Sequence, residues 1–328
     1  MVLAKKHIKV LADGGKILSS EIIGGGITVG NVYYVIKSTE AFYANFQKDN
    51  DFKYTDRSRS IHTTIQSALD ATVSNRNDYV IVMPSESDYD LTAALTMSKK
   101  AVHLICPGGL GNEIGATNAA RIHQTADVDV MTLSQSSIEI AGFYFKNYDL
   151  QAGITGATSV AGVGVYGCNI HHNTFAMRST TVAAEPMINF SGDAGAWGSI
   201  ENNWMITTVS NATYTSIIKI ESSATSARVK NNEITIGDGC TATIAISNQA
   251  VKGVTSGNII SECGGSGVAD GGTVTVAVSI HVSGNAIGNR CAVAAGQALS
   301  GGTPAHSFVD NMDGATGAGN GAASNLET

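Results

Sequence analysis

Ile170-His-His-Asn173-Thr-Phe175, Ile200-Glu-Asn-Asn203-Trp-Met205 and Val229-Lys-Asn-Asn232-Glu-Ile234 share one frame, in which an asparagine has an apolar residue three positions before it and another two positions after it. The frame begins at Ile140-Ala-Gly-Phe143-Tyr-Phe145, where phenylalanine replaces asparagine. It continues in Thr255-Ser-Gly-Asn258-Ile-Ile260, Val282-Ser-Gly-Asn285-Ala-Ile287 and Phe308-Val-Asp-Asn311. The asparagines are 30, 29, 26, 27 and 26 residues apart, so the chain carries a repeat of nearly constant length.

The length of this repeat predicts a parallel β-helix. A period of 26–30 residues without a helical segment excludes tetratricopeptide, ankyrin and HEAT arrays, and the leucine pattern of leucine-rich repeats is missing. The period fits one coil of a three-sided stack of short strands whose apolar residues turn inward on both sides of a tight corner. Asparagine suits the corner because it tolerates left-handed backbone angles and its amide can bond to backbone or to the next asparagine.

The sequence therefore predicts an all-β fold, a right-handed parallel β-helix. Its structural asparagine corner is expected at Asn173, Asn203, Asn232, Asn258, Asn285 and Asn311.

Composition agrees with a β-rich globular chain. Of the 328 residues, 43% are hydrophobic and 14% charged, with 37 glycines and 4 prolines. The net charge of −7 divides into +3 over residues 1–60 (9 Lys/Arg against 6 Asp/Glu) and −10 over residues 61–328 (11 against 21). An acidic body argues against nucleic acid as a partner, because phosphate contacts require clustered basic residues. The 5 cysteines show no CxxC pair and no zinc-like spacing, and we expect them to be reduced core residues.

Three regions are expected along the chain. Residues 1–31 hold short glycine-punctuated fragments and are predicted to form an extended arm. Residues 32–311 form the β-helix, in which a polar loop through Arg59 is followed by an amphipathic helix at about 60–73, capped by Ser60. Residues 312–328 form a Gly/Ala-rich tail. We find no signal peptide and no membrane span, and we expect synthesis in the cytoplasm.

The order of parts resembles the pectate-lyase-like β-helix superfamily. These parts are a VYYV strand, a loop, the helix IHTTIQSALDA, the strand YVIVMP, then KKAVHLICPGG and IEIAGFYFKN. The most specific phrases are Thr64-Ile-Gln-Ser-Ala-Leu-Asp70 and the stretch from Ile138 to Asn147, and the resemblance covers about residues 32–311. It implies that the 60–73 helix caps the amino-terminal end of the stack. It specifies the fold better than the activity, because members include polysaccharide lyases, hydrolases, phage tailspikes and phage structural proteins.

Within this superfamily the chain is most similar to a phage virion protein. It has a glycine-rich arm, few charges, no secretion signal and a Gly/Ala-rich end. The similarity implies a structural component of a bacteriophage particle, of tailspike, fibre or capsid-decoration type, located in the virion. We expect a homo-oligomer, a trimer by resemblance, that contacts other virion proteins through residues 1–31. A host surface glycan is a further expected partner, and no cofactor is expected.

Three outward residues form the candidate site. Alignment of the repeats places His171, Glu201, Lys230, Ser256 and Ser283 two positions before the corner residue, and Thr174, Trp204, Glu233, Ile259 and Ala286 one position after it. Of these, Glu201, Trp204 and Glu233 cluster. Paired carboxylates roughly 5–10 Å apart suit a glycosidase, and a tryptophan ring can stack on a sugar.

This cluster supports two alternatives to a structural role. The first is a polysaccharide depolymerase, a glycoside hydrolase or lyase acting on host envelope glycan, with Glu201 and Glu233 as acid and base or nucleophile. The calcium-lyase pattern is not carried over, because no acidic ladder and no arginine align over successive coils. The second is a non-catalytic carbohydrate-binding module that uses Trp204.

The pair His171-His172 is not expected to bind a metal ion. Consecutive strand residues face opposite sides of a sheet, and the aligned coils supply no further histidine. The sequence therefore predicts no metal site.

Overall fold

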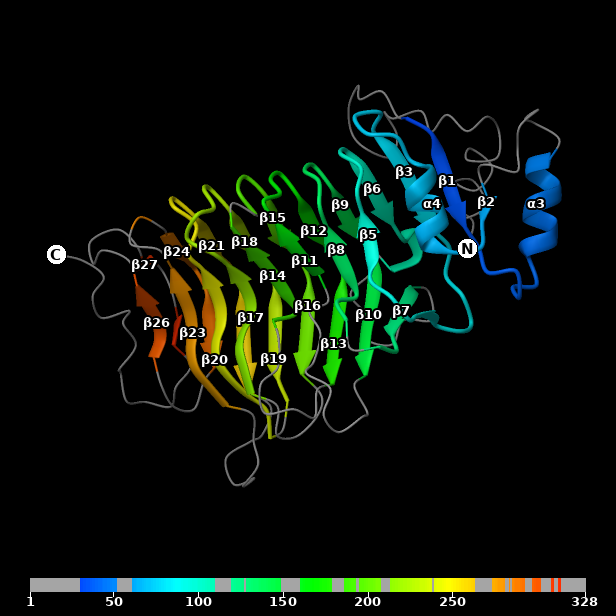
Figure 1. Ribbon diagram of the computed structural model, residues 1–328. Coiled ribbons are helices and arrows are strands. Elements are labelled where there is room, and N and C mark those ends of the chain that lie inside the picture. Colours follow the sequence, from blue (N-terminus) through cyan, green and yellow to red (C-terminus); the bar gives the residue numbers. More distant parts are fainter. Residues whose placement is uncertain are drawn as a thin grey trace.

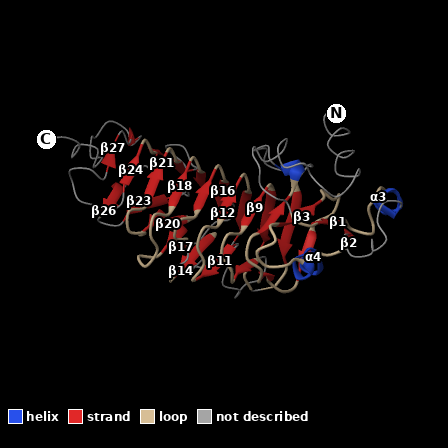
Figure 2. Ribbon diagram, turned by 90° about the horizontal axis from the view of Figure 1, so that it is seen from above, coloured by secondary structure: helices blue, strands red, loops and turns tan. Residues whose placement is uncertain are grey.

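The computed structural model shows coils of short strands stacked along one axis (Figure 1). It describes residues 30–51, 61–109, 119–126, 128–148, 160–178, 186–192, 195–207, 213–237, 239–262, 273–280, 283, 285–292, 297–301, 308–309 and 312–313. Seen from above, the strands succeed one another from the amino-terminal to the carboxy-terminal end of the stack (Figure 2). The predicted parallel β-helix is confirmed.

Three parallel sheets form the sides of this stack. Sheet A contains, in spatial order, β2 (Ile61–His62), β1 (Val32–Val35), β3 (Asp78–Val82), β6 (Val102–Ile105), β9 (Glu139–Ala141), β12 (Asn169–His171), β15 (Ser199–Glu201), β18 (Arg228–Lys230), β21 (Val254–Ser256), β24 (Asn285–Ile287) and β27 (Phe308–Val309). Sheet B contains β28 (Met312–Asp313), β25 (Arg290–Ala292), β22 (Ile259–Glu262), β19 (Glu233–Ile236), β16 (Trp204–Thr207), β13 (Thr174–Arg178), β10 (Phe143–Tyr148), β7 (Ala120–Gln124) and β4 (Tyr89–Leu91). Sheet C contains β26 (Gln297–Gly301), β23 (Thr273–Ile280), β20 (Thr241–Asn248), β17 (Thr213–Ile220), β14 (Ile188–Ser191), β11 (Val160–Val163), β8 (Met131–Leu133) and β5 (Leu95–Met97). From β6 to β27 each sheet A strand is three elements from the next, as a three-sided coil requires.

Inward side chains stack in columns that run along the axis. In sheet A one buried column consists of Val80, Leu104, Ile140, Ile170, Ile200, Val229, Thr255 and Ala286. In sheet B the rings of Phe145 and Phe175 stack with their centroids 4.8 Å apart. Burying one such large apolar side chain contributes about 1.5–3 kcal/mol, so the repeated column is the main favourable term for the fold.

Among the described residues, two short α-helices lie near the amino-terminal end. α4 (Ile65–Ala71) packs beside β1, β3 and β5, and buries Ile65 and Leu69. Its cap is Thr64, whose side chain accepts from the backbone N–H of Ser67, so the prediction of Ser60 as the cap is wrong. The helix is shorter than predicted because β2 occupies residues 61–62. Its capping role stays a prediction.

The loop predicted before this helix contains a second one. α3 (Tyr43–Asp51) has few apolar residues, which is why its sequence reads as a loop. The Phe46 ring packs edge-on against Tyr34 of β1, with centroids 5.1 Å apart. Contact with the sheet therefore stabilises a helix that its own sequence favours weakly.

A ladder of buried asparagines joins sheet A to sheet B on successive coils. Its rungs are Asn173, Asn203, Asn232, Asn258 and Asn289. The Oδ1 atom of Asn203 accepts from the backbone N–H and the Nδ2 atom of Asn173, both at 3.1 Å. Its Nδ2 atom donates to the Ile170 carbonyl at 2.9 Å and to Asn232 Oδ1 at 3.0 Å. Every hydrogen-bonding position of this buried amide is filled, so the ladder is structural, as predicted for its first four members.

The fifth rung is Asn289, and the prediction of Asn285 is wrong. Asn285 lies in β24 opposite Val254, whereas Asn289 Oδ1 accepts from Asn258 Nδ2 at 2.8 Å. The frame is carried by Ala286-Ile-Gly-Asn289-Arg-Cys291, on a coil longer than its predecessor. Asn311 lies outside the described residues.

On the coils that contain β9, β12, β15, β18 and β21, two corners use left-handed backbone. At the corner between sheets A and B, the residue before the ladder position has a positive φ of 52–83°, in Gly142, His172, Asn202, Asn231, Gly257 and Gly288. The ladder asparagines themselves do not adopt this conformation. At the corner between sheets C and A, the left-handed residues are Ala101, Ser137, Gly167, Trp197, Ser226 and Lys252. The predicted left-handed angle therefore belongs to the residue before each asparagine.

The predicted arm, tail and cysteines are only partly within the described residues. Residues 1–29 and 314–328 lie outside them, while Met312–Asp313 continues the stack as β28, which moves its end beyond residue 311. Cys106, Cys168 and Cys240 are buried in the core, as predicted. The side chains of Cys263 and Cys291 lie outside the described part. No helix among the described residues is long and apolar enough to span a membrane.

Candidate functional site

A groove crosses the outer face of sheet B just beyond the asparagine ladder. Trp204, Glu233 and Ile259 each begin a strand and stand opposite one another in register on three consecutive coils. The groove has a volume of about 410 Å³. It is lined by Asn203, Trp204, Asn231, Asn232, Glu233, Gly257 and Ile259. Two of the three predicted site residues therefore share one surface hollow.

The groove combines three kinds of contact. The indole Nε1 of Trp204 is buried and has no hydrogen-bond partner. Glu233 is exposed and offers a carboxylate, and Ile259, 43% exposed, offers an apolar surface. A sugar ring can stack on the partly exposed indole while one of its hydroxyls donates to the carboxylate, which is the chemistry of a sugar rather than of an anion.

Glu201 does not line this groove. It ends β15 in sheet A, in register between His171 and Lys230, whereas Glu233 lies in sheet B. The left-handed corner at Asn202 separates the two faces. The structure thus brings Trp204 and Glu233 together and leaves Glu201 on another face.

Two outward positions on the later coil were predicted wrongly. Ile287, not Ser283, stands in register with Ser256, and Arg290, not Ala286, stands in register with Ile259. Ala286 is fully buried. Both errors follow from taking Asn285 as the corner residue.

A row of histidines around Glu139 lies on the outer face of sheet A and was missed in the sequence. Glu139 binds His103 Nδ1 through one carboxylate oxygen and accepts from His171 Nε2 at 2.8 Å through the other. The Nδ1 atoms of His171 and His172 lie 2.9 Å apart. His103 and Glu139 face each other in register, so extending the alignment one coil earlier would have found this pair.

The charges in this row are strongly coupled. Burial raises the pKa of Glu139, but the hydrogen bonds and charges of His103 and His171 outweigh burial and bring the pKa to about 2. Burial and then the charge of Glu139 raise the pKa of Tyr79, whose ring stacks on His103 at 4.2 Å, to about 12. Burial and then the charge of His171 lower the pKa of His172, against the opposite influence of Glu201. Glu139 is therefore ionised and firmly held at neutral pH.

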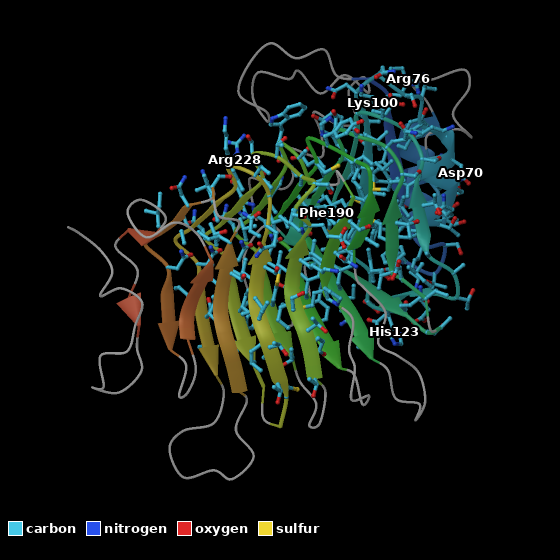
Figure 3. All side chains as sticks on the ribbon, turned by 60° about the vertical axis from the view of Figure 1, so that its left-hand side comes forward. Asp70, Arg76, Lys100, His123, Phe190 and Arg228 are labelled. Atoms are coloured by element: carbon cyan, nitrogen blue, oxygen red, sulfur yellow. The ribbon has the colours of Figure 1, made fainter. Side chains whose placement is uncertain are left out.

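A second polar cluster is formed by Asp88, Asp90 and His123. Their donor atoms lie within 4.8 Å of one another, and His123 lies across the stack from Arg76 and Lys100 (Figure 3). Asp88 already pairs with Arg121 and Lys146, each at 2.7 Å. Burial raises the pKa of Asp88, but Lys146 and Arg121 outweigh it and hold the pKa below its usual value. Two cationic side chains thus stand where a metal ion would have to bind.

Comparison of the chain with protein-family models, with curated proteins and with solved structures gives no match. The geometry described above therefore carries the functional interpretation.

Proposed function

We propose that this protein is a non-catalytic, structural β-helix of a bacteriophage particle. The observation that carries this proposal is the use of acidic side chains as ties between coils. Glu139 ties β9 to β6 and β12, and Asp88 joins β7 and β10. Carboxylates held by hydrogen bonds and ion pairs in this way reinforce a stack and are poorly suited to act as general acids or bases.

The separation of Glu201 from Glu233 supports the same proposal. A hydrolase requires its two carboxylates to flank one substrate bond, and these two residues project from different sheets. The resemblance to phage members of the pectate-lyase-like superfamily supplies the biological setting, a trimeric rod attached through residues 1–31.

The proposal is tested on purified phage particles assembled with and without the gene. We expect quantitative mass spectrometry to find the protein at a fixed copy number divisible by three, and cross-linking to join residues 1–31 to another virion protein. Absence of the protein from intact particles would contradict the proposal.

The groove at Trp204 favours a second function, binding of a neutral glycan without turnover. We expect a glycan array to show binding that Trp204→Ala abolishes. Trp197→Ala is the matched control, because Trp197 is 64% exposed at the other left-handed corner. Equal loss of binding in both variants would contradict this site.

The same preparation distinguishes binding from depolymerisation. Host envelope polysaccharide is incubated with the protein, and reducing ends and unsaturated uronates are measured. We expect neither product. Release that Glu201→Gln and Glu233→Gln both abolish would establish the depolymerase instead.

A further inference from the structure

We propose that His171 and His172 form a binding site for a single divalent copper ion, chelated by their Nδ1 atoms on the outer face of the β-helix. The site shares Glu139 and His171 with the tie between β9 and β12, and it lies apart from the groove at Trp204.

The two rings meet because of the backbone conformation at the corner. His171 ends β12 with its side chain outward, and His172 follows in the left-handed conformation at φ 54°. The rule that consecutive residues face opposite sides holds within a strand, and His172 is outside the strand. The expectation that this pair cannot share a ligand therefore rests on a wrong premise.

The His171 ring is oriented by a carboxylate. Its Nε2 donates to Glu139 Oε1 at 2.8 Å, which leaves Nδ1 as the nitrogen that carries the lone pair. Glu139 is itself held by His103. A carboxylate that accepts from the distal nitrogen of a histidine is the usual outer support of a metal-binding histidine, because it sets the tautomer and strengthens the ligand.

The spacing of the nitrogens selects the coordination geometry. With metal–nitrogen bonds of about 2.0–2.1 Å, donors 2.9 Å apart subtend about 90° at the ion. That angle is the cis angle of a tetragonal centre, which Cu²⁺ prefers, and is too small for tetrahedral Zn²⁺. The ring centroids are 5.1 Å apart at 86°, and in the metal-free protein the Nδ1–H of His172 donates to Nδ1 of His171. When Cu²⁺ binds, the His172 proton moves from Nδ1 to Nε2, and a small rotation of this half-buried ring, which keeps the two Nδ1 atoms close together, turns both lone pairs onto one ion.

The surroundings favour a cation. Glu139 lies on one side of the pair, and Glu201 of the next coil is in register with His171 on the other. The Glu201 carbonyl also accepts from the backbone N–H of His172 at 3.3 Å, which ties the left-handed corner to the next coil. Water completes the coordination on the open side, because both histidines are partly exposed.

The experiment titrates CuCl₂ into the full chain at neutral pH and follows binding by calorimetry and by electron paramagnetic resonance. We expect one bound Cu²⁺ whose spectrum shows two nitrogen ligands, and weaker binding of ZnCl₂. His172→Asn and His171→Ser should each weaken Cu²⁺ binding more than tenfold. These replacements copy equivalent positions on other coils, Asn202 and Ser256, so they preserve the corner and the strand. Glu139→Gln should weaken binding about tenfold, because it removes the carboxylate that orients the His171 ring.

The matched control is His123→Ala, which removes the histidine of the Asp88 cluster and should leave Cu²⁺ affinity unchanged. The proposal is overturned if His171→Ser and His172→Asn bind Cu²⁺ as the parent does, if His123→Ala abolishes binding, or if Zn²⁺ binds more tightly than Cu²⁺.

Discussion

The two kinds of left-handed corner share a backbone conformation but differ in the residue that follows it. Between sheets A and B this residue is asparagine on five coils. Between sheets C and A it is apolar or small, namely Val102, Ile138, Cys168, Gly198, Ala227 and Gly253. At two of the second corners this N–H bonds within its own coil, from Gly198 to the Gly195 carbonyl at 3.0 Å and from Gly253 to the Ala250 carbonyl at 2.9 Å. At the first corner the chain enters the next strand at once, and the N–H of Asn173 bonds to the Asn203 side chain.

We infer that asparagine is used where the turn offers no backbone acceptor for the N–H of the residue that follows it. A buried N–H must find a partner. Where the turn is long enough to supply a carbonyl, as at Gly198 and Gly253, no side-chain acceptor is needed. Where it is not, the side chain must supply the acceptor, and asparagine also donates back to a carbonyl of the preceding coil.

The most severe test of this comparison removes one rung. Asn203→Leu keeps the side-chain volume but leaves the Asn173 N–H, the Ile170 carbonyl and half of the Asn232 contacts unpaired. At about 1–3 kcal/mol for each buried unpaired group, we expect a loss of about 4 kcal/mol in the free energy of unfolding, measured by urea denaturation. A loss below about 1 kcal/mol would show that the ladder is dispensable.

The reciprocal test places asparagine at the other corner. Ile138 is buried at the position after Ser137, and nothing there requires an amide. Ile138→Asn should cost about 2 kcal/mol more than Ile138→Ala, because it buries a polar group without partners. Equal stability of the two variants in urea would mean that either corner can accommodate a ladder.

A third test compares the outer face of sheet A with the interior ladder at the first corner. Glu139→Gln removes the ties to His103 and His171 and should cost about 1–2 kcal/mol in metal-free buffer at pH 6. Because folding depresses the pKa of Glu139 from 4.5 to about 2, this contribution is complete above pH 4.5 and is lost as the pH falls toward 2. Parent and variant should converge over that range in acid titrations of stability, whereas the deficit of Asn203→Leu should persist. A pH-independent deficit for Glu139→Gln would assign its effect to packing.

The smallest expected effect concerns the left-handed residues themselves. Lys252→Gly at the second corner should raise the free energy of unfolding by about 0.5 kcal/mol, because a side chain is strained at φ 57°. Asn231→Gly at the first corner should change it less, because asparagine tolerates φ 52°. Thermal unfolding of the two variants side by side measures the contrast, and a larger gain at Asn231 would reverse it.

Prediction of the site succeeded only in part. Trp204 and Glu233 were placed together correctly, because residues one position after the ladder stand in one column. Glu201 was added wrongly, because a linear alignment does not show that a corner at Asn202 directs it to another sheet. The histidine row was missed because Glu139 and His103 lie before the first asparagine, where the repeat is hardest to see.

By itself, the sequence determined the parallel β-helix, its period and the asparagine corner. These depend on side-chain alternation within a strand and on the hydrogen bonds one buried amide can make, both of which recur locally in every coil. Only the tertiary structure decided that Asn289 is the fifth rung and that His171 meets His172 and Glu139. Those contacts depend on the register between coils of unequal length and on the sign of φ at single corner residues, which no short stretch of sequence specifies.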